Sequence, residues 1–168
     1  MLLQEKIALV YGAGGAVGGA VARAFAREGA RVILAGRTTA RLEKVASNIH
    51  GNGGWAAVAP VDALDAAAIE SHLAGVLQQT GPVKVMFNAI DWGDVQGQAL
   101  VDMRLEEYAP VVERAVKTWF LTGTATARQM IAHGGGTIVG ITANAGRTPI
   151  PMVGGFGVAC AAVEQFLR

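Results

Sequence analysis

A glycine-rich segment between an apolar run and a helical pattern constrains the fold of this chain more than any other feature. This segment, YGAGGAVGG, spans residues 11–19. It follows the apolar run at residues 7–10 and precedes a helix-patterned segment at residues 20–28. A strand that ends in glycines and leads into a helix leaves unpaired backbone N–H groups and a partial positive charge at the helix start. This order of elements predicts a phosphate-binding loop.

The glycine spacing departs from the common dinucleotide pattern G-x-G-x-x-G, because Val17 stands where the last glycine is required. A looser spacing, G-x-x-x-G-x-G, places Gly12 first and Gly18 last, with Ala16 at the middle position. Alanine there adds a methyl group where backbone and pyrophosphate should approach closely. The alternative interpretation is a tight packing turn without a ligand. We expect cofactor contacts from Gly12, Gly14, Gly15, Ala16, Val17 and Gly18.

Short β-rich runs alternate with helical patterns along the chain, which is typical of a parallel sheet with helices on both faces. The sequence shows no internal repeat and no low-complexity linker, and 52% of its residues are hydrophobic. We therefore predict one α/β domain over residues 1–168, a doubly wound parallel sheet (Rossmann fold) of about five strands. The expected strands are 7–11, 31–35, 55–59, 83–87 and 137–142, and the expected helices are 20–28, 40–49, 66–79, 104–133 and 154–168.

Composition excludes several classes of partner. Lys plus Arg number 14 against 13 Asp plus Glu, so no overall field recruits nucleic acid or an acidic membrane surface. Cys160 is the only cysteine, which excludes an internal disulfide and suits a reducing compartment. No long apolar stretch lacks charge, and the first residues do not resemble a signal peptide. We expect a cytoplasmic protein.

The three histidines, His50, His72 and His133, have no acidic or cysteine partner at metal-ligand spacing. We interpret them as surface residues and expect no metal site.

The end of the second expected strand indicates which dinucleotide the chain prefers. In a dinucleotide-binding fold, an acidic residue about 20 residues beyond the glycine loop accepts a hydrogen bond from the ribose 2′-OH. Gly36 provides no such group, and Arg37 beside it offers a guanidinium fork suited to a 2′-phosphate. The sequence favours NADP(H) over NAD(H). A solvated arginine near the start of a helix is the alternative.

Several segments resemble the short-chain dehydrogenase/reductase family: the glycine loop with its looser spacing, Asn88-Ala89, the segment GGGTIVGITANAG at residues 134–146 and the segment FGVACAAVE at residues 156–164. The resemblance implies that Asp62 contacts the adenine amino group with help from the backbone of Ala63. It also implies that Asn88 and Ala89 pass under the cofactor ribose. Helix capping is an equal alternative for Asp62, and it is the better interpretation for Asp65.

The resemblance also locates the positions where a reaction centre is expected. Members of this family reduce carbonyls or oxidise alcohols with a Tyr-x-x-x-Lys pair, a serine and an asparagine. Tyrosine exchanges a proton with the substrate oxygen, lysine lowers the pKa of the phenol, serine orients the oxygen and asparagine holds a relay water. The matching positions here carry Phe156, Cys160, Ala143 and Ala115. Since none of these side chains can play its part, we predict no ordinary hydride transfer.

Three functions remain open. The first is a non-catalytic member that binds NADP(H) or a protein partner. The second is a weak NADP(H)-dependent oxidoreductase of carbonyls or alcohols, helped by Thr142, although a residue next to Ala143 on a strand should point to the opposite face. The third is a purely structural, dimerising subunit without a cofactor. Cys160 as a nucleophile is disfavoured, because no basic residue lies near it in the sequence.

Members of the family continue past the last helix with two more strands, whereas this sequence ends at Arg168. We therefore expect the strand at 137–142 to form an exposed sheet edge, and the helices at 104–133 and 154–168 to expose apolar faces. The family pairs these two helices between subunits, which implies a homodimer or homotetramer. A truncated sequence is equally consistent, and no segment indicates a substrate.

Overall fold

The computed structural model describes the whole chain, Met1–Arg168. The chain forms two compact units. Unit 1 comprises residues 1–90 and 121–140, and unit 2 comprises residues 91–120 and 141–168. That residues 1–168 act as one domain stays a prediction.

A parallel sheet of 5 strands forms the centre of unit 1, with the order β3-β2-β1-β4-β5. All neighbouring strands are parallel, and β1, the middle strand, is buried along its whole length. This topology confirms the predicted doubly wound fold. The expectation of β5 at an edge of the sheet is also confirmed. The strands are β1 Ile7–Tyr11, β2 Arg31–Gly36, β3 Trp55–Pro60, β4 Val83–Asn88 and β5 Thr137–Gly140.

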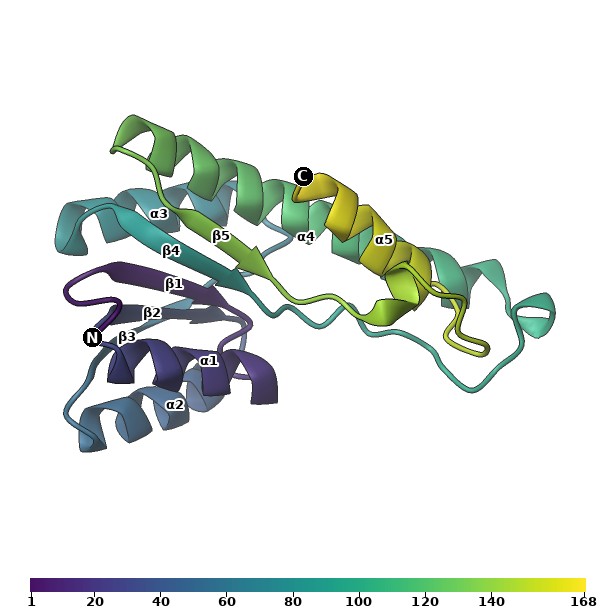
Figure 1. The fold of residues 1–168 in the computed structure, drawn as a ribbon, viewed down its shortest axis with the longest axis horizontal. Helices are drawn as coiled ribbons and strands as arrows, with labels where there is room; N and C mark the ends of the chain where they lie inside the picture. Colours follow the sequence, from purple (N-terminus) through teal and green to yellow (C-terminus); the bar gives the residue numbers. More distant parts are fainter. The chain divides into compact units, whose positions relative to one another are not determined.

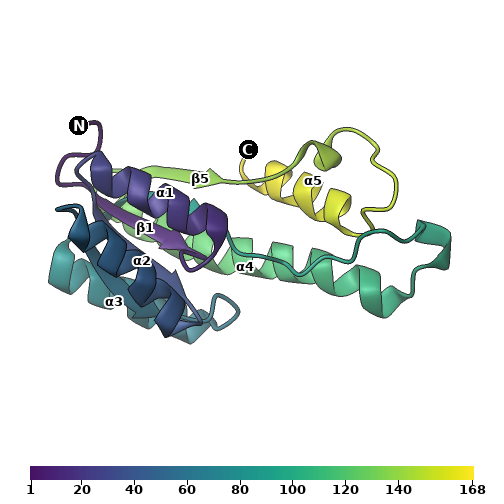
Figure 2. The same cartoon turned by 90° about the horizontal axis from the view of Figure 1, so that it is seen from below.

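Helices cover both faces of this sheet. Figures 1 and 2 show α1 and α2 on one face, with α3 on the other. Small side chains such as Ala8 and Ala22 let α1 approach the sheet closely, and Val10 and Leu34 fill the core beside them. The helices of unit 1 are α1 Ala16–Arg27, α2 Thr39–Gly51, α3 Ala66–Thr80 and the end of α4 Leu105–Ala132.

The first helix begins earlier than the sequence suggests. We expected a start at residue 20, but α1 starts at Ala16, inside the glycine loop. Glycine has a low helix propensity, and here packing outweighs it. Gly18 and Gly19 are buried, and the Gly19 N–H donates to the Gly15 carbonyl at 2.9 Å. A Cβ on Gly18 would lie 2.3 Å from the Gly12 carbonyl oxygen, so only glycine fits.

The sequence predicts a C-terminal glycine cap at Gly29 and an N-terminal cap at Asp65, and the structure confirms both. Gly29 follows α1 with φ +87 and donates its N–H to the Ala26 carbonyl, as a C-terminal glycine does. Asp65 precedes α3 and accepts a hydrogen bond from the Ala68 N–H at 2.9 Å. Local capping chemistry therefore fixes where these helices end and begin.

Unit 2 is built mainly from the first part of α4, up to Phe120, and from α5 Phe156–Phe166, with short 3-10 turns at Leu100–Asp102 and Asn144–Gly146. The Trp119 and Phe166 rings pack with their centroids 6.2 Å apart. The apolar side predicted for α4 is buried at Val111, Ala115 and Trp119. It is exposed at Val116 and Phe120, because the neighbouring elements cover only part of a wide apolar face.

The fifth strand is shorter than predicted. It ends at Gly140 and leaves Thr142 in the loop that follows. Its only partner is β4, and the paired stretch stops where β4 stops, at Asn88. Without a hydrogen-bonding neighbour on its other side, β5 has no ladder to extend it further.

One histidine differs from the expectation of a surface residue. His50 and His133 are exposed, but His72 is half-buried on α3, and burial lowers its pKa. No group of three or more His, Cys, Asp or Glu side chains could hold a metal ion. None of the helices combines the length and apolar character needed to span a bilayer.

The close approach at Gly12 predicts a stability difference between two glycines of similar conformation. Gly12 and Gly53 both have positive φ, +74 and +76, but a Cβ on Gly12 would lie 2.4 Å from the Ala89 carbonyl oxygen, whereas one on Gly53 meets open space. We expect Gly53→Ala to cost about 1 kcal/mol for backbone strain alone. Gly12→Ala should cost about 3 kcal/mol, because overpacking adds to the strain.

Urea unfolding followed by circular dichroism would measure both free energies in the absence of any ligand. Equal losses in the two variants would show that the contact between Gly12 and Ala89 is not tight.

Candidate functional site

Backbone hydrogen bonds bring the glycine loop and the ends of its neighbouring strands to one edge of the sheet in unit 1. The Gly12 N–H donates to the Ala35 carbonyl at 2.9 Å, and the Ala89 N–H donates to the Tyr11 carbonyl at 3.0 Å. The Val61 N–H donates to the Gly36 carbonyl at 3.0 Å. Because the strands are parallel, all these contacts lie at the carboxyl ends, where open α/β sheets bind their ligands.

Gly12 makes the closest contact at this edge. Its positive φ is one that L side chains rarely adopt, and its Cα packs directly on the backbone of Ala89. Gly14 allows a second close approach, since a Cβ there would lie 3.0 Å from the Arg41 Cβ on α2. The two glycines thus let the loop pack against Ala89 on one side and against α2 on the other.

The start of α1 is open to an anion. Gly15 caps the helix in an extended conformation without any side-chain hydrogen bond, and no acidic residue lies in the first turn. Gly15, Ala16 and Val17 are all exposed, so the Ala16 methyl group does not fill a buried space. The first amides of a helix have no partner within it and carry its partial positive charge. This terminus can therefore accept a phosphate.

Arg37 follows β2 directly at the same edge. Its side chain is exposed, and it forms no ion pair with an acidic residue. Gly36 before it packs near Leu42 and carries no side chain. An unpaired guanidinium beside an uncapped helix start gives this edge a positive character.

Asp62 and Ala63 follow β3 at the next strand end. Asp62 is exposed, and one of its carboxylate oxygens, Oδ1, accepts a hydrogen bond from the Leu64 N–H at 3.0 Å. This contact is a local turn rather than a cap on α3, which Asp65 provides. The second oxygen of Asp62 remains available for a ligand amino group. Ala63 is buried, so only its backbone can take part.

The side chain of Asn88 supports the turn that follows β4. The residue is buried, its Nδ2 donates to the Thr122 hydroxyl at 3.1 Å, and its Oδ1 accepts from the Ile90 N–H at 3.0 Å. These two bonds shape the turn after β4 and hold Ala89 against Tyr11. The amide of Asn88 therefore positions the Ala89 backbone, and each of its two polar atoms still has one hydrogen-bonding position unused. That Asn88 itself contacts the cofactor ribose stays a prediction.

Tyr11 is a phenol at the end of β1. Its ring is 1% exposed, and burial raises the pKa of its hydroxyl far above the ordinary value. The Thr126 hydroxyl nearby offsets only part of this shift. A phenol with a raised pKa and no access to solvent is a poor proton donor, so Tyr11 is a core residue.

The sequence Asp91-Trp92-Gly93-Asp94 predicts a solvated turn, and the loop at residues 91–94 in unit 2 fits that prediction only in part. Asp91 fits that prediction, because it is exposed and accepts the Gly93 N–H at 2.9 Å. Trp92 does not, since it is 6% exposed and its ring lies 6.0 Å from that of Phe156. Two aromatic rings gain more by packing together than a turn tryptophan gains in solvent.

Cys160 and Ala115 are fully buried in unit 2. Burial raises the pKa of the Cys160 thiol, and a hydrogen bond from the Ala143 backbone offsets the shift only in part. The carboxylates of Glu164 and Asp94 raise the same pKa further. Cys160 is therefore a neutral core thiol, as the sequence predicted, and not a nucleophile.

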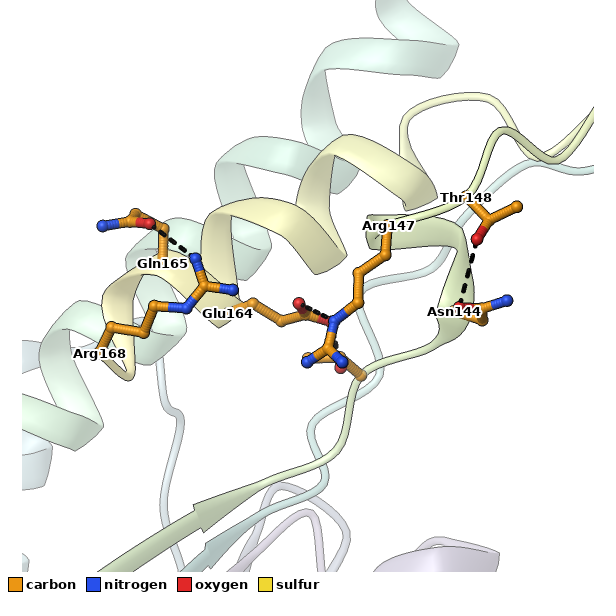
Figure 3. A network of polar contacts seen from close by, with 7 residues as sticks. Asn144, Arg147, Thr148, Glu164, Gln165 and Arg168 are labelled. Carbon is orange, nitrogen blue, oxygen red and sulfur yellow. Dashed lines mark hydrogen bonds and ion pairs between the residues drawn. The ribbon is translucent and has the colours of Figure 1, made fainter.

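A polar network that the sequence did not reveal fixes the loop before α5 (Figure 3). Arg147 Nε donates to Glu164 Oε2 at 2.7 Å, and the Thr142 hydroxyl donates to Glu164 Oε1 at 3.0 Å. These bonds, the one from Arg147 first, lower the pKa of Glu164. The only sequence signal was that Glu164 ends the segment at residues 156–164. The partners lie too far away along the chain for spacing to reveal.

The family is shown by direct comparison. A sequence model described as short chain dehydrogenase matches residues 6–168, nearly the whole chain. The chain belongs to the short-chain dehydrogenase family. The matched residues include the glycine loop and the open helix start. This family binds nicotinamide cofactors.

Curated relatives have different activities and are longer than this short-chain dehydrogenase chain. It is 26% identical over 166 residues to 2,3-dihydro-2,3-dihydroxybenzoate dehydrogenase of Bacillus subtilis, covering 99% of the chain and 63% of the relative. It is 31% identical over 134 residues to gluconate 5-dehydrogenase of Gluconobacter oxydans, covering 80% and 52%. Glycine betaine reductase ATRR of Emericella nidulans is 28% identical over 166 residues, covering 99% and 13%. The chain thus spans less than two thirds of the length of each.

Solved short-chain dehydrogenase structures share the fold. One from Mycobacterium marinum is 33% identical, with a TM-score of 0.87 over 98% of this chain and 67% of its own. A metagenomic short-chain oxidoreductase in complex with NADP is 28% identical, with a TM-score of 0.87 over 99% and 75%. An NAD+-bound xylitol dehydrogenase is 27% identical, with a TM-score of 0.91 over 99% and 64%.

The network around Glu164 predicts a specific dependence of stability on pH. A carboxyl group whose pKa is lower in the folded state contributes stability above its unfolded pKa and loses that stability as the pH falls through the folded value. The folded protein should therefore lose stability below pH 4.5, the ordinary value for this group. Glu164→Gln should lower the thermal midpoint near neutral pH and flatten its fall in acid.

Circular dichroism melts from about pH 3 to pH 7 would measure both effects. Glu113→Gln is the matched control, because Glu113 forms only an exposed pair with Lys117 at 3.9 Å. If the two variants behave alike, the Glu164 network does not stabilise the loop.

Proposed function

We propose that this short-chain dehydrogenase family member binds NADP(H) in unit 1 and has lost most or all of its capacity for hydride transfer. The observation that supports binding best is the exposed, uncapped start of α1 behind a glycine loop, in a family that binds nicotinamide cofactors. The pyrophosphate would lie on the amides of Gly14 and of residues 16–18, with Ala16 and Val17 in the first helical turn, and beside Gly15, whose own N–H donates to the Gly12 carbonyl at 3.0 Å.

The other contacts follow the order of the strand ends. Arg37 would hold the 2′-phosphate, Asp62 would accept from the adenine amino group, and the backbone of Ala63 would help to place the base. Ala89 would contact the ribose with its backbone, held in place by the buried Asn88. No step of the chemistry is required of these residues, which bind and orient only.

The preference for NADP(H) depends on two neighbouring positions. Gly36 lacks the carboxylate that would accept from a free 2′-OH and would repel a phosphate. Arg37 adds a charge that no acidic side chain neutralises in the structure. Similar structures include one with NADP and one with NAD+, so the fold does not distinguish the two cofactors. The preference for NADP(H) therefore rests on Gly36 and Arg37.

The loss of activity follows from side chains at the positions that resemble the family's catalytic residues. A bound reduced nicotinamide would supply a hydride to a carbonyl carbon, and the carbonyl oxygen must then receive a proton. Phe156 has no proton to give, and Ala143 and Ala115 carry no hydrogen-bonding group. Cys160 is a neutral buried thiol rather than a cation. Removal of general acid catalysis alone costs roughly 10²–10⁴ in rate.

Thr142 does not replace these groups. Its hydroxyl donates to Glu164, which also accepts from Arg147. Breaking this bond to serve a substrate oxygen would leave Glu164 with one donor fewer, so the hydroxyl is already committed to the loop. The proposal of a weak oxidoreductase that depends on Thr142 is therefore the less favoured one.

We also propose that the chain associates with a second copy of itself through α4 and α5, as the family resemblance implies. Val116 and Phe120 lie one turn apart on α4 and are 48% and 57% exposed. On α5, Val158 and Phe166 are 48% and 41% exposed. Burial of such side chains against a copy would stabilise the unit that carries them. Sedimentation that shows only monomer at every concentration would contradict this proposal.

The Arg37 assignment predicts a loss that is selective for one cofactor. In Arg37→Ala, we expect the affinity for NADPH to fall about 10- to 100-fold, because a charge-assisted contact to the phosphate is lost. The affinity for NADH should stay the same. Titration followed by nicotinamide fluorescence would measure both constants.

Arg27→Ala is the matched control, since Arg27 is also exposed but lies at the other end of α1 from the glycine loop. An equal loss in both variants would indicate a general effect of charge. No binding of NADPH to the unmodified chain at millimolar concentration would support the structural role instead.

Restoring the missing groups tests the proposed inactivity. The unmodified chain should consume no NADPH above background with a panel of aldehydes and ketones. The triple variant Phe156→Tyr, Cys160→Lys, Ala143→Ser should gain at least about 100-fold in rate, because it regains a general acid and its partners. The absorbance of NADPH would measure both. The Glu164 and Asp94 carboxylates, which disfavour a thiolate at position 160, would favour an ammonium there.

A variant with Phe156→Leu and Cys160→Met fills the same positions without functional groups and should stay inactive. Turnover of the unmodified chain at ordinary enzyme rates, about 1–10³ per second, would overturn the proposal of inactivity. An inactive triple variant would show that more than these side chains has been lost.

A further inference from the structure

A groove of about 630 Å³ runs along β3 in unit 1, between the edge of the sheet and α3. None of the residues proposed to contact the cofactor lines it, neither the glycine loop nor Arg37 nor Asn88. Its size falls within the range of pockets that hold small organic ligands. No part of the proposed NADP(H) contacts accounts for this space.

Small side chains produce the groove. Strand pairing places Ile33 opposite Ala57, and the next residues on that face are Ala35 and Ala59. The alanine side chains are short, so they leave space above the sheet near its edge. On α3, a face with helical spacing carries Gly75 toward the same space, and a Cβ added to Gly75 would meet nothing within 4 Å. The flat face of an aromatic ring can lie on such a floor of small side chains.

One buried polar atom in this groove has no partner. His72 Nε2 is shielded from solvent and makes no hydrogen bond. Burial lowers the pKa of His72, so the ring is neutral and can either donate or accept at this nitrogen. Buried polar atoms are rarely left unpaired in folded proteins. The half-buried imidazole lines the groove, so a rotation of its ring on ligand binding would bring this nitrogen to a ligand atom.

The end of the groove at the start of β3 carries a positive charge. The Arg31 guanidinium lies over the Trp55 ring, 4.4 Å from its centroid, and both residues line the groove. Arg31 forms no ion pair, and no Asp or Glu lines the groove. The charge therefore complements an anion, and the stacked ring fixes the direction of the guanidinium.

We propose that this groove binds a small aromatic acid. The flat ring lies on Ala57 and Ala59 beside Gly75, a polar atom of the ligand bonds to His72 Nε2, and the carboxylate pairs with Arg31. The assignment is independent of the dinucleotide site, so either can be correct without the other. It adds a second ligand class to the chain.

The experiment uses 2-naphthoate as the probe and 2-naphthalenemethanol as its uncharged counterpart. Isothermal titration should detect 2-naphthoate with a dissociation constant of about 1 mM or lower, as expected for a ligand of this size. Gly75→Leu fills the groove and should weaken binding at least about 10-fold. Ala67→Leu places the same side chain on an exposed position of α3 and should bind as the unmodified chain does. Circular dichroism would confirm that each variant is folded.

Arg31→Gln separates the charge from the shape. It should weaken 2-naphthoate about 10-fold and leave 2-naphthalenemethanol unchanged, because only the acid meets the guanidinium. If Gly75→Leu does not fold, Ser71→Leu offers a second way to fill the groove from α3. The proposal is wrong if the unmodified chain does not bind 2-naphthoate at about 10 mM, ten times the expected dissociation constant. It is also wrong if filling the groove leaves the affinity unchanged, since the probe would then bind elsewhere.

Discussion

The contact between Gly12 and the backbone of Ala89 is the constraint on which the rest of unit 1 depends. The loop can turn from β1 into α1 only if residue 12 takes a positive φ, and it can lie against the end of β4 only if residue 12 has no side chain. Gly18 then packs on the Gly12 carbonyl, which sets the start of α1. A single backbone geometry thus orients the helix whose open amides carry a partial positive charge at the edge of the sheet.

The two units differ in how completely their polar groups are used. At the sheet edge of unit 1, the first amides of α1, the Arg37 guanidinium and one oxygen of Asp62 remain without partners in the protein. In unit 2, Thr142, Arg147 and Glu164 satisfy one another, Cys160 is neutral and buried, and Phe156 packs on Trp92. A binding surface needs unpaired groups, whereas a set of mutually satisfied groups mainly holds a loop in place. This contrast supports a protein that binds a dinucleotide and does little chemistry on it.

Most of the fold could be predicted from the sequence, because its signals are local. Runs of β-branched and apolar residues placed every strand, and capping residues such as Gly29 and Asp65 marked helix ends. The start of α1 could not be predicted, since tertiary packing of Gly18 overrides a weak helix propensity. In the candidate site, local spacing indicated the glycine loop and Arg37. It could not indicate the buried amide of Asn88, the ring of Trp92 or the partners of Glu164, because each depends on residues distant in the sequence.

The uncapped start of α1 has a thermodynamic consequence for the protein in a cell. A helix end without a capping side chain is less stable than one with such a cap, and an anion that binds only the folded form adds stability by mass action. Occupancy would then shift the balance between folded and opened chains, and with it the rate at which proteases degrade the chain. A ligand that undergoes no reaction on this scaffold would still govern how long each copy survives.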